Sequence, residues 1–579
     1  MKSKTCHQCH SNFTVTDDDL TFYQKMTVPP PTWCPDCRAI RRMQWRNERS
    51  LYCRKCDATG VDIVSCFAPE KKLIVYDQKY WWSDAWDPLT YGQDYDFSQP
   101  FFGQWRELLH RVPQLSVSNA NAENSEYCNV NSHSKDCYLI SASFQNERVM
   151  YTNRVVGCHD CLDNYILNQS QYCYDNIACT NCYQVFYSQD SNNCRESYFL
   201  YNCHQCQNCL GCINLRNKQY CIFNQQCTKE EYEQQIKQLN LSSRQSLNQI
   251  EEKFSVIKSQ SIRKFANLIN CENCTGDNLT NCKNCKNCFD LGDNVQNCNY
   301  SVWGGYDLDG AFDTGPGVGS KSSLIYEAYD SGINSTNLAF TGVVYDSFQV
   351  RYSIFCFNCQ NIFGCIGLRH KEYCILNKQY TKEEYEQLLP KIIAQMNTLP
   401  YIDRLGRQYD YGEFFPPEIS PFAYNETVAQ EYYPTTKELA IQQGFSWRDP
   451  DPKQFQPTIL HQNIPDSIIG LDEKILSAVF ECSHQGHCDE QCNQVFKILP
   501  AELAFYLKNN IPLPHLCPNC RHYQRIKKRN PLKLYPRQCM CEEPNHTHET
   551  RCPNQFATTY SPDRPEKVYC EECYQKSVI

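Results

Sequence analysis

Two nested internal repeats constrain the fold of this chain more than any other feature. A shift of 483 residues aligns Cys9–Cys56, without a gap, with a segment near the other end of the chain, and it places Cys34 on Cys517. A shift of 153 residues aligns two middle segments and places Cys203 on Cys356. The sequence therefore predicts one module that occurs at both ends and a central unit that occurs twice.

Within the central units, cysteines recur at alternating spacings of 12 and 9 residues, which suggests a coil of 21 residues. Asn or Asp precedes many of them, as in Asn181-Cys182, and both residue types accept left-handed backbone angles at tight turns. Stacked Asn amides can also hydrogen-bond from coil to coil. We therefore expect two parallel β-solenoid segments, 116–227 and 269–380, each with several coils around an aromatic-lined core.

A solenoid end exposes unpaired backbone and needs a cover. Thr228 and Thr381 each have Glu three residues later, which is the spacing of a helix capping box. The predicted fold class is mainly β with some α, and homologous treble-clef or zinc-ribbon modules flank the solenoids. The expected domains are an N-terminal zinc module (1–115), solenoid 1 (116–227), a helical cap (228–268), solenoid 2 (269–380), a second helical cap (381–397), an extended linker (398–480) and a C-terminal zinc module (481–579).

The cysteine content points to metal binding. The chain has 41 cysteines among 579 residues, and the odd number forbids complete disulfide pairing. No run approaches the ~18 apolar residues of a membrane span, and no apolar signal segment follows Met1. We expect a cytoplasmic protein without a membrane partner, whose cysteines are reduced and serve in metal ligation and packing.

Paired cysteine knuckles predict the metal ligands. Their spacing is typical of structural zinc, because four thiolates leave no open position for water. The expected sets are Cys6, Cys9, Cys34 and Cys37; Cys488, Cys492, Cys517 and Cys520, with Cys482, His484 and His487 as alternatives to Cys488; and Cys539, Cys552, Cys570 and Cys573, with Cys541 as a competing ligand. We therefore predict about three Zn²⁺ ions. The N-terminal counterparts of the third set are Cys56, Thr59, Asp77 and Tyr80, where we expect no metal.

Cysteines three residues apart inside the central units invite an iron–sulfur interpretation. Cys203, Cys206, Cys209 and Cys212 have this spacing, but the bacterial ferredoxin run requires three residues before its last Cys and a Pro after it. We favour inward-pointing cysteines at coil corners over a cluster or an additional zinc site. No nucleophile elbow, HExxH motif or paired-carboxylate arrangement is present, so no catalytic residue is predicted.

Positive charge is concentrated after two of the knuckles. The segments 34–56 and 517–537 have net charges of +5 and +7, whereas the whole chain is −9. Such helices could lie along nucleic-acid phosphates, or they could dock on the acidic remainder of the same chain, which we consider the better explanation. The possible nucleic-acid contacts are Arg38, Arg41, Arg42, Arg46, Arg521, Arg525, Lys527, Lys528 and Arg529.

Five motifs resemble those of an uncharacterised group of cysteine-rich, zinc-ribbon-bearing proteins from candidate-phyla bacteria. They are Val28–Arg38 (VPPPTWCPDCR), Tyr80–Asp84 (YWWSD), Asn214–Asn224 (NLRNKQYCIFN), Ser420–Asn425 (SPFAYN) and Tyr560–Cys570 (YSPDRPEKVYC). The resemblance extends nearly from end to end and implies zinc and a cytoplasmic setting, but no established activity. In that group the second N-terminal ribbon is usually complete, so Thr59, Asp77 and Tyr80 are departures.

The expected function is a zinc-stabilised, non-enzymatic scaffold or adaptor that presents solenoid faces to an unknown protein partner. The alternative is RNA or DNA binding through the basic helices after Cys37 and Cys520. A third possibility, a metal-dependent or redox enzyme, rests only on the number of thiols without an assigned role.

Overall fold

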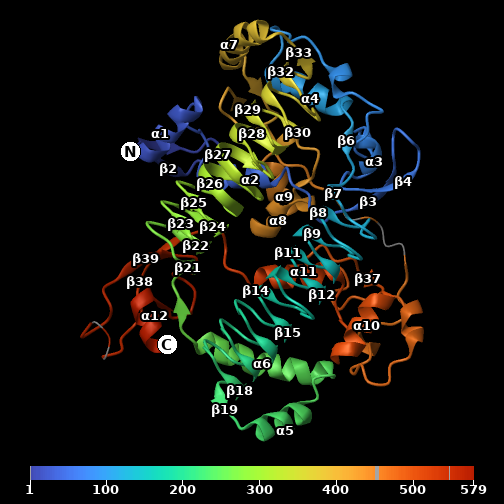
Figure 1. The fold of residues 1–579 in the computed structure, drawn as a ribbon, viewed down its shortest axis with the longest axis vertical. Coiled ribbons are helices and arrows are strands. Elements are labelled where there is room, and N and C mark those ends of the chain that lie inside the picture. The colour runs from blue at the N-terminus through green and yellow to red at the C-terminus, as the bar shows by residue number, and fades with distance from the viewer. Residues whose placement is uncertain (1, 450, 452–454, 545, 547, 579) are drawn as a thin grey trace.

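The computed structural model describes residues 2–449, 451, 455–544, 546 and 548–578. More residues lie in strands than in helices, and most strand pairs are parallel. Two long strand stacks form the centre of the molecule, and helices and the terminal modules lie around them (Figure 1). Within the described ranges, no helix is both long and apolar enough to cross a membrane.

Stack 1 consists of short parallel strands between residues 119 and 226. Successive strands pair at a constant register offset, as Asn153 pairs with Tyr165 and Tyr165 with Ile177. Its strands are β7 (Asn119–Ala120), β8 (Asn129–Ser132), β9 (Ser141–Phe144), β10 (Glu147–Met150), β11 (Asn153–Val156), β12 (His159–Leu162), β13 (Tyr165–Asn168), β14 (Ile177–Thr180), β15 (Tyr183–Phe186), β16 (Arg195–Tyr198), β17 (Gln207–Leu210), β18 (Gln219–Ile222) and β19 (Gln225–Gln226).

Stack 2 repeats this arrangement between residues 268 and 379, with longer strands in its middle. Thr336 pairs with Phe348 at the same offset as in stack 1, whereas the offset from Tyr306 to Ser320 is two positions longer. Its strands are β21 (Leu268–Ile269), β22 (Gly276–Thr280), β23 (Cys282–Lys283), β24 (Cys288–Leu291), β25 (Val295–Gln296), β26 (Val302–Thr314), β27 (Val318–Tyr329), β28 (Thr336–Tyr345), β29 (Phe348–Arg351), β30 (Ile354–Phe357), β31 (Gln360–Phe363), β32 (Glu372–Ile375) and β33 (Lys378–Gln379).

The prediction of a 21-residue coil is wrong. Paired residues on successive strands of stack 1, such as Asn153 and Tyr165, are separated by fewer than 21 residues. Almost every third residue there has a positive φ, and the residue that follows points inward. The run Asp136, Leu139, Ala142, Gln145 and Arg148 is one example. Four such triplets make one repeat. Spacings of 9 and 12 are both multiples of three, so their sum of 21 reflects only which inward positions carry cysteine.

The predicted aromatic-lined core is also wrong for the inside of the stacks. Among the described residues, the two interior clusters contain small and branched apolar side chains and no aromatic ring. Thiols satisfy backbone groups there: the Cys173 Sγ donates to the Cys182 carbonyl at 3.7 Å. A coil side of three residues leaves too little width for a ring, which explains the use of Cys, Ser, Asn and Val. The aromatic side chains lie outside, between the stacks and the elements that cover them.

Amide ladders connect successive repeats, as the Asn pattern predicts. On stack 2, the Asn270 amide donates to Asn281 at 3.2 Å, and Asn281 donates to Asp293 at 2.7 Å. A parallel ladder runs from Asn273 through Asn284 to further residues of the next repeats. Asn270, Asn273, Asn281 and Asp293 are exposed and Asn284 is half-buried, so stack 2 presents amide and carboxylate groups on successive repeats.

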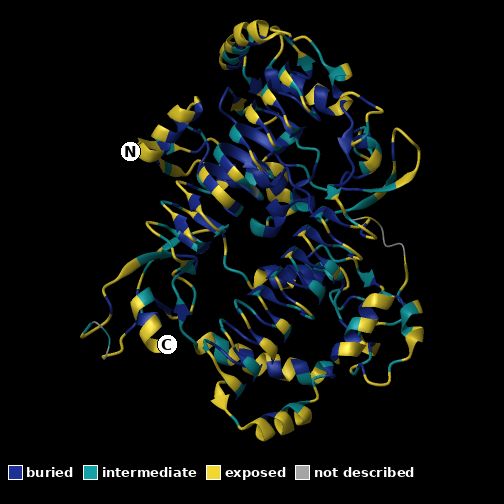
Figure 2. Ribbon diagram, viewed as in Figure 1, coloured by how far each residue is buried: buried dark blue, intermediate teal, exposed yellow. Residues whose placement is uncertain are grey.

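Helices begin at both predicted capping boxes. The Thr228 side chain accepts a hydrogen bond from the Glu231 amide, and the Thr381 side chain accepts one from the Glu384 amide. In both boxes the Glu carboxylate accepts a hydrogen bond from the Thr backbone N–H. Tyr232 and Tyr385 pack on Tyr220 and Tyr373 of the last strands, while the outer helix faces are exposed (Figure 2). The helices are α5 (Lys229–Leu239), α6 (Arg244–Gln260) and α7 (Lys382–Thr398).

The terminal modules share one plan of a strand pair, a helix, a second helix and another strand pair. The N-terminal module has β1 (Lys2–Thr5), β2 (Asn12–Val15), α1 (Asp17–Met26), α2 (Pro35–Met43), β3 (Tyr52–Lys55), β4 (Asp62–Ser65), β5 (Val75–Tyr76), α3 (Gln78–Trp81), η1 (Pro88–Tyr91), α4 (Phe101–Arg111) and β6 (Gln114–Leu115). The C-terminal module has β36 (Phe480–Glu481), β37 (Val495–Phe496), α10 (Pro500–Asn509), α11 (Pro518–Lys527), β38 (Tyr535–Gln538), β39 (Gln555–Thr558), β40 (Val568–Tyr569) and α12 (Glu571–Val578).

The segment 398–480 is packed into the molecule and does not simply lie over a surface. Phe414 and Phe415 are fully buried in the largest hydrophobic cluster, and Val428 and Phe445 are buried in another. Its elements are β34 (Tyr401–Ile402), β35 (Gln408–Tyr409), η2 (Pro417–Ile419), η3 (Tyr424–Glu426), α8 (Val428–Tyr432), α9 (Lys437–Gln442), η4 (His461–Asn463) and η5 (Glu473–Ser477). Its prolines limit regular structure without preventing burial.

Candidate metal centres and the junction cavity

The first group of four thiols forms where the β1–β2 hairpin meets the start of α2. The ligand atoms of Cys6, Cys9, Cys34 and Cys37 all lie within 4.8 Å of one another. The Sγ atoms of Cys9 and Cys34 are 3.7 Å apart, close to the ~3.8 Å between thiolates in a tetrahedron with 2.3 Å zinc–sulfur bonds. Hydrogen bonds from the Cys34 and Cys37 thiols lower the pKa of Cys6, which favours the thiolate that a metal requires.

The second group contains Cys482 where we expected Cys488. Cys482, Cys492, Cys517 and Cys520 come together, with Sγ atoms 3.8 Å apart between Cys482 and Cys520. Cys482 occupies the position of Cys6: its Sγ accepts from the Cys517 amide at 3.3 Å, as the Cys6 Sγ accepts from Cys34 at 3.2 Å.

The reason for this correction is the length of the hairpin. Cys6 and Cys9 are three residues apart, whereas Cys482 and Cys492 are ten apart, so the C-terminal knuckle contains a seven-residue insertion. Cys488 lies inside the insertion, where it groups with His484, Glu490 and Cys520. An ungapped shift cannot detect this. The Cys482 hydrogen bond lowers the pKa of Cys492 to about 6.

The third group lies between β38, β39 and the start of α12. Cys539, Cys552, Cys570 and Cys573 are all buried, and the Cys552 and Cys570 Sγ atoms are 3.9 Å apart. A fourth group brings Cys541, His546 and His548 to the same Cys573. The sequence interpretation included Cys541 only as a competitor and missed both histidines, although the spacing Cys541-x4-His546-x-His548 was visible.

The N-terminal counterpart of the third group keeps only one of its four thiols, that of Cys56. The Cys56 Sγ donates to the Asp77 carboxylate at 3.3 Å and accepts from the Asp77 amide at 3.3 Å. The second bond repeats the one from the Cys570 amide to Cys539. Asp77 also caps α3 by accepting from the Tyr80 amide at 3.0 Å. The N-terminal module therefore keeps the strand pair β3–β4, but it has hydrogen bonds where the C-terminal copy has four cysteines.

Cysteine thiols inside the stacks donate hydrogen bonds to backbone carbonyls of the next repeat. The Cys203 Sγ donates to the Cys212 carbonyl at 3.3 Å, and Cys212 donates to the Cys221 carbonyl at 3.4 Å. Burial raises the pKa of Cys128 to about 12 and that of Cys359 to about 11. Across the described part of the chain, no group of metal-ligating atoms includes these interior cysteines. Their arrangement is that of packing residues.

The basic side chains of α2 are buried against stack 2. Arg38 pairs with Asp313 at 2.8 Å, and Arg41 pairs with Glu327 at 3.0 Å and with Glu413 at 2.8 Å. Burial alone would lower the pKa of Arg41, but Glu327 and Glu413 raise it above its ordinary value. Arg42 also contacts Asp313 and Glu327, and Arg46 contacts Glu48 and Asp330. All four guanidinium groups are committed within the chain.

The basic side chains of α11 dock on stack 1 in the same way. Arg521 and Arg525 both pair with Asp163, at 2.9 and 3.0 Å, and Arg525 also pairs with Asp175. Arg529 crosses to Asp290 of stack 2 at 2.8 Å. Lys527 and Lys528 remain exposed and pair with Glu490 and Glu251. Of the nine residues predicted as possible nucleic-acid contacts, only these two lysines are exposed.

Each terminal module contacts both stacks, in a reciprocal pattern (Figure 1). Helix α2 packs on β26 and β27 of stack 2, while β5 pairs with β6 at the entry to stack 1. Helix α11 packs on β13 of stack 1, while β40 pairs with β20 (Arg263–Lys264) at the entry to stack 2. The two sequence repeats thus combine into one pseudo-twofold arrangement.

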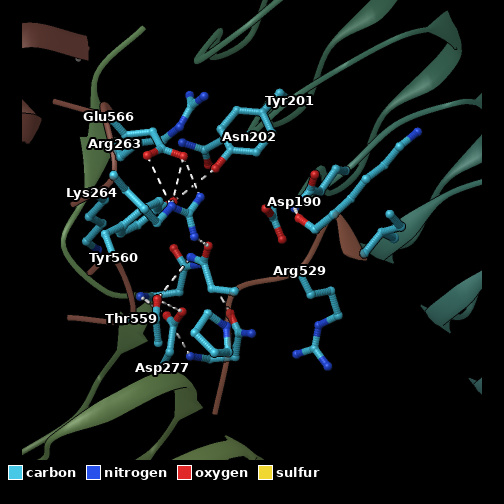
Figure 3. Close-up of a pocket in the computed structure, with 18 of the residues that line it drawn as sticks. Asp190, Tyr201, Asn202, Arg263, Lys264, Asp277, Arg529, Thr559, Tyr560 and Glu566 are labelled. Atoms are coloured by element: carbon cyan, nitrogen blue, oxygen red, sulfur yellow. Dashed lines mark hydrogen bonds and ion pairs between the residues drawn. The ribbon is translucent and has the colours of Figure 1, made fainter. Parts of the chain in front are cut away.

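A polar cavity of about 360 Å³ lies where stack 1, α6, stack 2 and the C-terminal module meet. Figure 3 shows Asp190, Arg263, Asp277 and Arg529 arranged around it. Seven lysines and arginines and four carboxylates line the cavity, a net formal charge of +3. Burial raises the pKa of Asp190 to about 6 and lowers that of Lys258 to about 7.

The corresponding space beside the N-terminal module is nearly filled. A cavity of about 50 Å³ is lined by Trp45, Arg46 and Asn47, which align with Lys528, Arg529 and Asn530 of the large cavity. Trp45 is buried against Phe415, with ring centroids 5.0 Å apart, whereas the Lys528 side chain is 46% exposed. One substitution of an aromatic by a lysine thus accompanies the open cavity.

Comparison with known proteins gives no further identification: no protein-family model matches the chain, and no curated protein matches it significantly.

Proposed function

We propose that the protein is a zinc-stabilised, non-enzymatic scaffold that presents its strand stacks to a protein partner. In this proposal the stacks are parallel β-solenoids and the terminal modules are treble-clef and zinc-ribbon folds. The observation that carries the proposal is the reciprocal docking of two modules on two stacks through buried ion pairs such as Arg525–Asp163. This arrangement holds the stacks in one fixed relation.

Zinc is the metal that these sites suit best. Groups of four cysteines with 3.5–3.9 Å between Sγ atoms match the zinc tetrahedron. Four thiolates leave no position for a water or substrate, so the ions would be structural. The metal would contribute stability to modules whose own cores are small.

The exposed ladder on stack 2 supports a binding role. Asn281 bonds to Asp293 in one ladder and Asn284 bonds to Asn297 in the other, so each ladder runs across neighbouring repeats. Regularly spaced amides and carboxylates can pair with an extended polypeptide or with a complementary ladder. Such a surface recognises a partner by hydrogen bonds over a long face.

Capture from the native host tests this role. The tagged chain is cross-linked in lysate and its partners are identified, beside the double variant Asn281→Gly and Asn284→Gly. Glycine keeps the positive φ of both positions and removes the amides. Asn181→Gly on stack 1 is the matched control. A partner that the wild type and the control enrich and the double variant loses supports the proposal. No enriched partner, or equal enrichment by all three, contradicts it.

Nucleic-acid binding through the basic helices has little left to support it. Arg38, Arg41 and Arg525 are at most 2% exposed and are ion-paired within the chain. Phosphate contact would require these buried pairs to break, at about 3–5 kcal/mol each. RNA and DNA binding by the full chain over a series of salt concentrations is the direct check, and we expect no salt-dependent complex.

A second candidate function is binding of a small anion in the junction cavity. Its net charge of +3 carries this proposal, together with Lys258 and Arg263, which each lie 4.3 Å from the Tyr201 ring centroid. Inorganic phosphate and a panel of small phosphate and carboxylate compounds should raise the melting temperature. Lys258→Gln should abolish the rise, and the exposed Lys237→Gln should not. A rise that survives Lys258→Gln places binding elsewhere.

A further inference from the structure

A second cluster of metal ligands lies beside the third four-cysteine group. The ligand atoms of Cys541, His546, His548 and Cys573 all lie within 4.8 Å of one another. The Cys541 Sγ is 3.0 Å from His546 Nδ1, and His548 Nε2 is 3.4 Å from the Cys573 Sγ. Two thiols and two imidazoles form one of the standard tetrahedral ligand sets for zinc.

The loop that carries the histidines has no apolar anchor of its own. The Cys552 amide bonds to the Cys541 carbonyl at 3.0 Å and closes the loop between them. Of the described residues from 542 to 551, all are exposed except His546 and His548. Both imidazoles therefore turn toward thiols in a segment that otherwise faces water. Metal ligation explains this orientation, since burial of apolar surface cannot.

Cys573 belongs to both clusters. Its thiol lies with Cys539, Cys552 and Cys570 in one group and with Cys541, His546 and His548 in the other. We propose that the third four-cysteine group and this second cluster each bind one Zn²⁺ ion, with the Cys573 thiolate bridging the two ions. This inference rests on the zinc-binding part of the proposed function and adds a fourth ion to the three expected. The N-terminal module has no equivalent, because Ala58 aligns with Cys541.

Counting metal by native mass spectrometry tests the proposal on the full chain. The wild type should hold four zinc ions, and the double variant His546→Ala and His548→Ala should hold three. The control is His7→Ala with His10→Asn: both histidines are exposed beside the first group, and asparagine tolerates the positive φ of His10. The control should hold four.

The other outcomes separate the two proposals. A wild-type count of three, or four ions in the His546/His548 variant, overturns the proposed fourth ion and leaves the zinc modules intact. A wild-type count below three contradicts the zinc modules themselves, and the fourth ion with them. Because the histidines lie in an exposed loop, we expect the variant to keep the wild-type circular dichroism spectrum.

Zinc X-ray absorption gives an independent readout. The three four-cysteine groups contain no nitrogen, so zinc–nitrogen scattering at about 2.0–2.1 Å that depends on His546 and His548 reports the ion bound by these two residues. A bridged pair should also give metal–metal scattering at about 3.5–4 Å. Both signals should disappear in the double variant. Zinc–nitrogen scattering that persists there, or that is absent from the wild type, contradicts the assignment.

Discussion

The two terminal modules share one plan but are stabilised by different means. Both place a four-cysteine knuckle before a helix whose arginines dock on the distant stack. Beyond that helix they diverge: the N-terminal module joins Cys56 to Asp77 and buries Trp45, whereas the C-terminal module gathers four more cysteines and leaves a cavity. Aromatic packing thus occurs in the module with one four-cysteine group, and the polar cavity occurs in the module with two.

Loss of one zinc ligand should have the largest effect. Cys34→Ser and Cys517→Ser should each unfold one module, because zinc binding supplies folding free energy of ~10 kcal/mol in small domains. Limited proteolysis should cut the affected module first. The exposed Cys53, which belongs to no ligand group among the described residues, is the control, and Cys53→Ser should keep wild-type resistance. Equal resistance in all three variants would mean that metal does not build the modules.

Breaking a buried docking pair should have the next largest effect, of similar size on both sides. Asp163→Asn leaves Arg521 and Arg525 without their shared carboxylate, and Glu327→Gln does the same for Arg41. We expect each to lower the free energy of unfolding by about 3–5 kcal/mol in chemical denaturation. Asp62→Asn, in the exposed pair with Lys55, should cost less than about 1 kcal/mol. Equal costs for the buried and exposed pairs would argue against docking.

Trp45 and Lys528 should differ sharply despite their equivalent positions. Trp45→Ala removes a buried ring and should destabilise the protein by about 3–5 kcal/mol. Lys528→Ala trims an exposed side chain and should change stability by less than about 1 kcal/mol. Thermal denaturation of both variants measures the contrast. Similar losses would mean that the two junctions are packed alike.

Asp190 should make the cavity sensitive to pH. Because its folded-state pKa is raised to about 6, the folded protein binds the proton more tightly, and this contribution to stability is lost as pH rises from about 4 to 6. Asp190→Asn should remove that part of the pH dependence, by about 1–3 kcal/mol. Unfolding free energies at pH 4, 5 and 6 compare the two proteins. If the free energy of unfolding depends on pH in the same way in both proteins, the Asp190 carboxylate is solvated and its pKa is not raised.

The repeats and the paired cysteines could be predicted from the sequence because they depend on residues that are close together in the chain. Capping at Thr228 and Thr381, amide ladders and eleven of the twelve cysteines in the three four-cysteine groups follow from spacing alone. Cys482 was displaced by an insertion that an ungapped shift cannot represent. The predicted coil length was wrong because cysteine occupies only some of the inward positions. The three-residue periodicity appears in full only in the backbone φ angles. Docking of α2 on stack 2 depends on contacts between distant parts of the chain, such as that of Arg41 with Glu327. Residue spacing does not predict such contacts.

Hydrogen exchange on the knuckle variants tests the reciprocal arrangement most directly. If each module stabilises the stack on which its helix docks, Cys517→Ser should raise hydrogen exchange in the C-terminal module and also in β13 and β14 of stack 1. Strands β26 and β27 should stay protected. Cys34→Ser should show the opposite pattern, with new exchange in β26 and β27 and protection in β13 and β14. Exchange confined to the mutated module, or an identical stack response in both variants, would contradict the account.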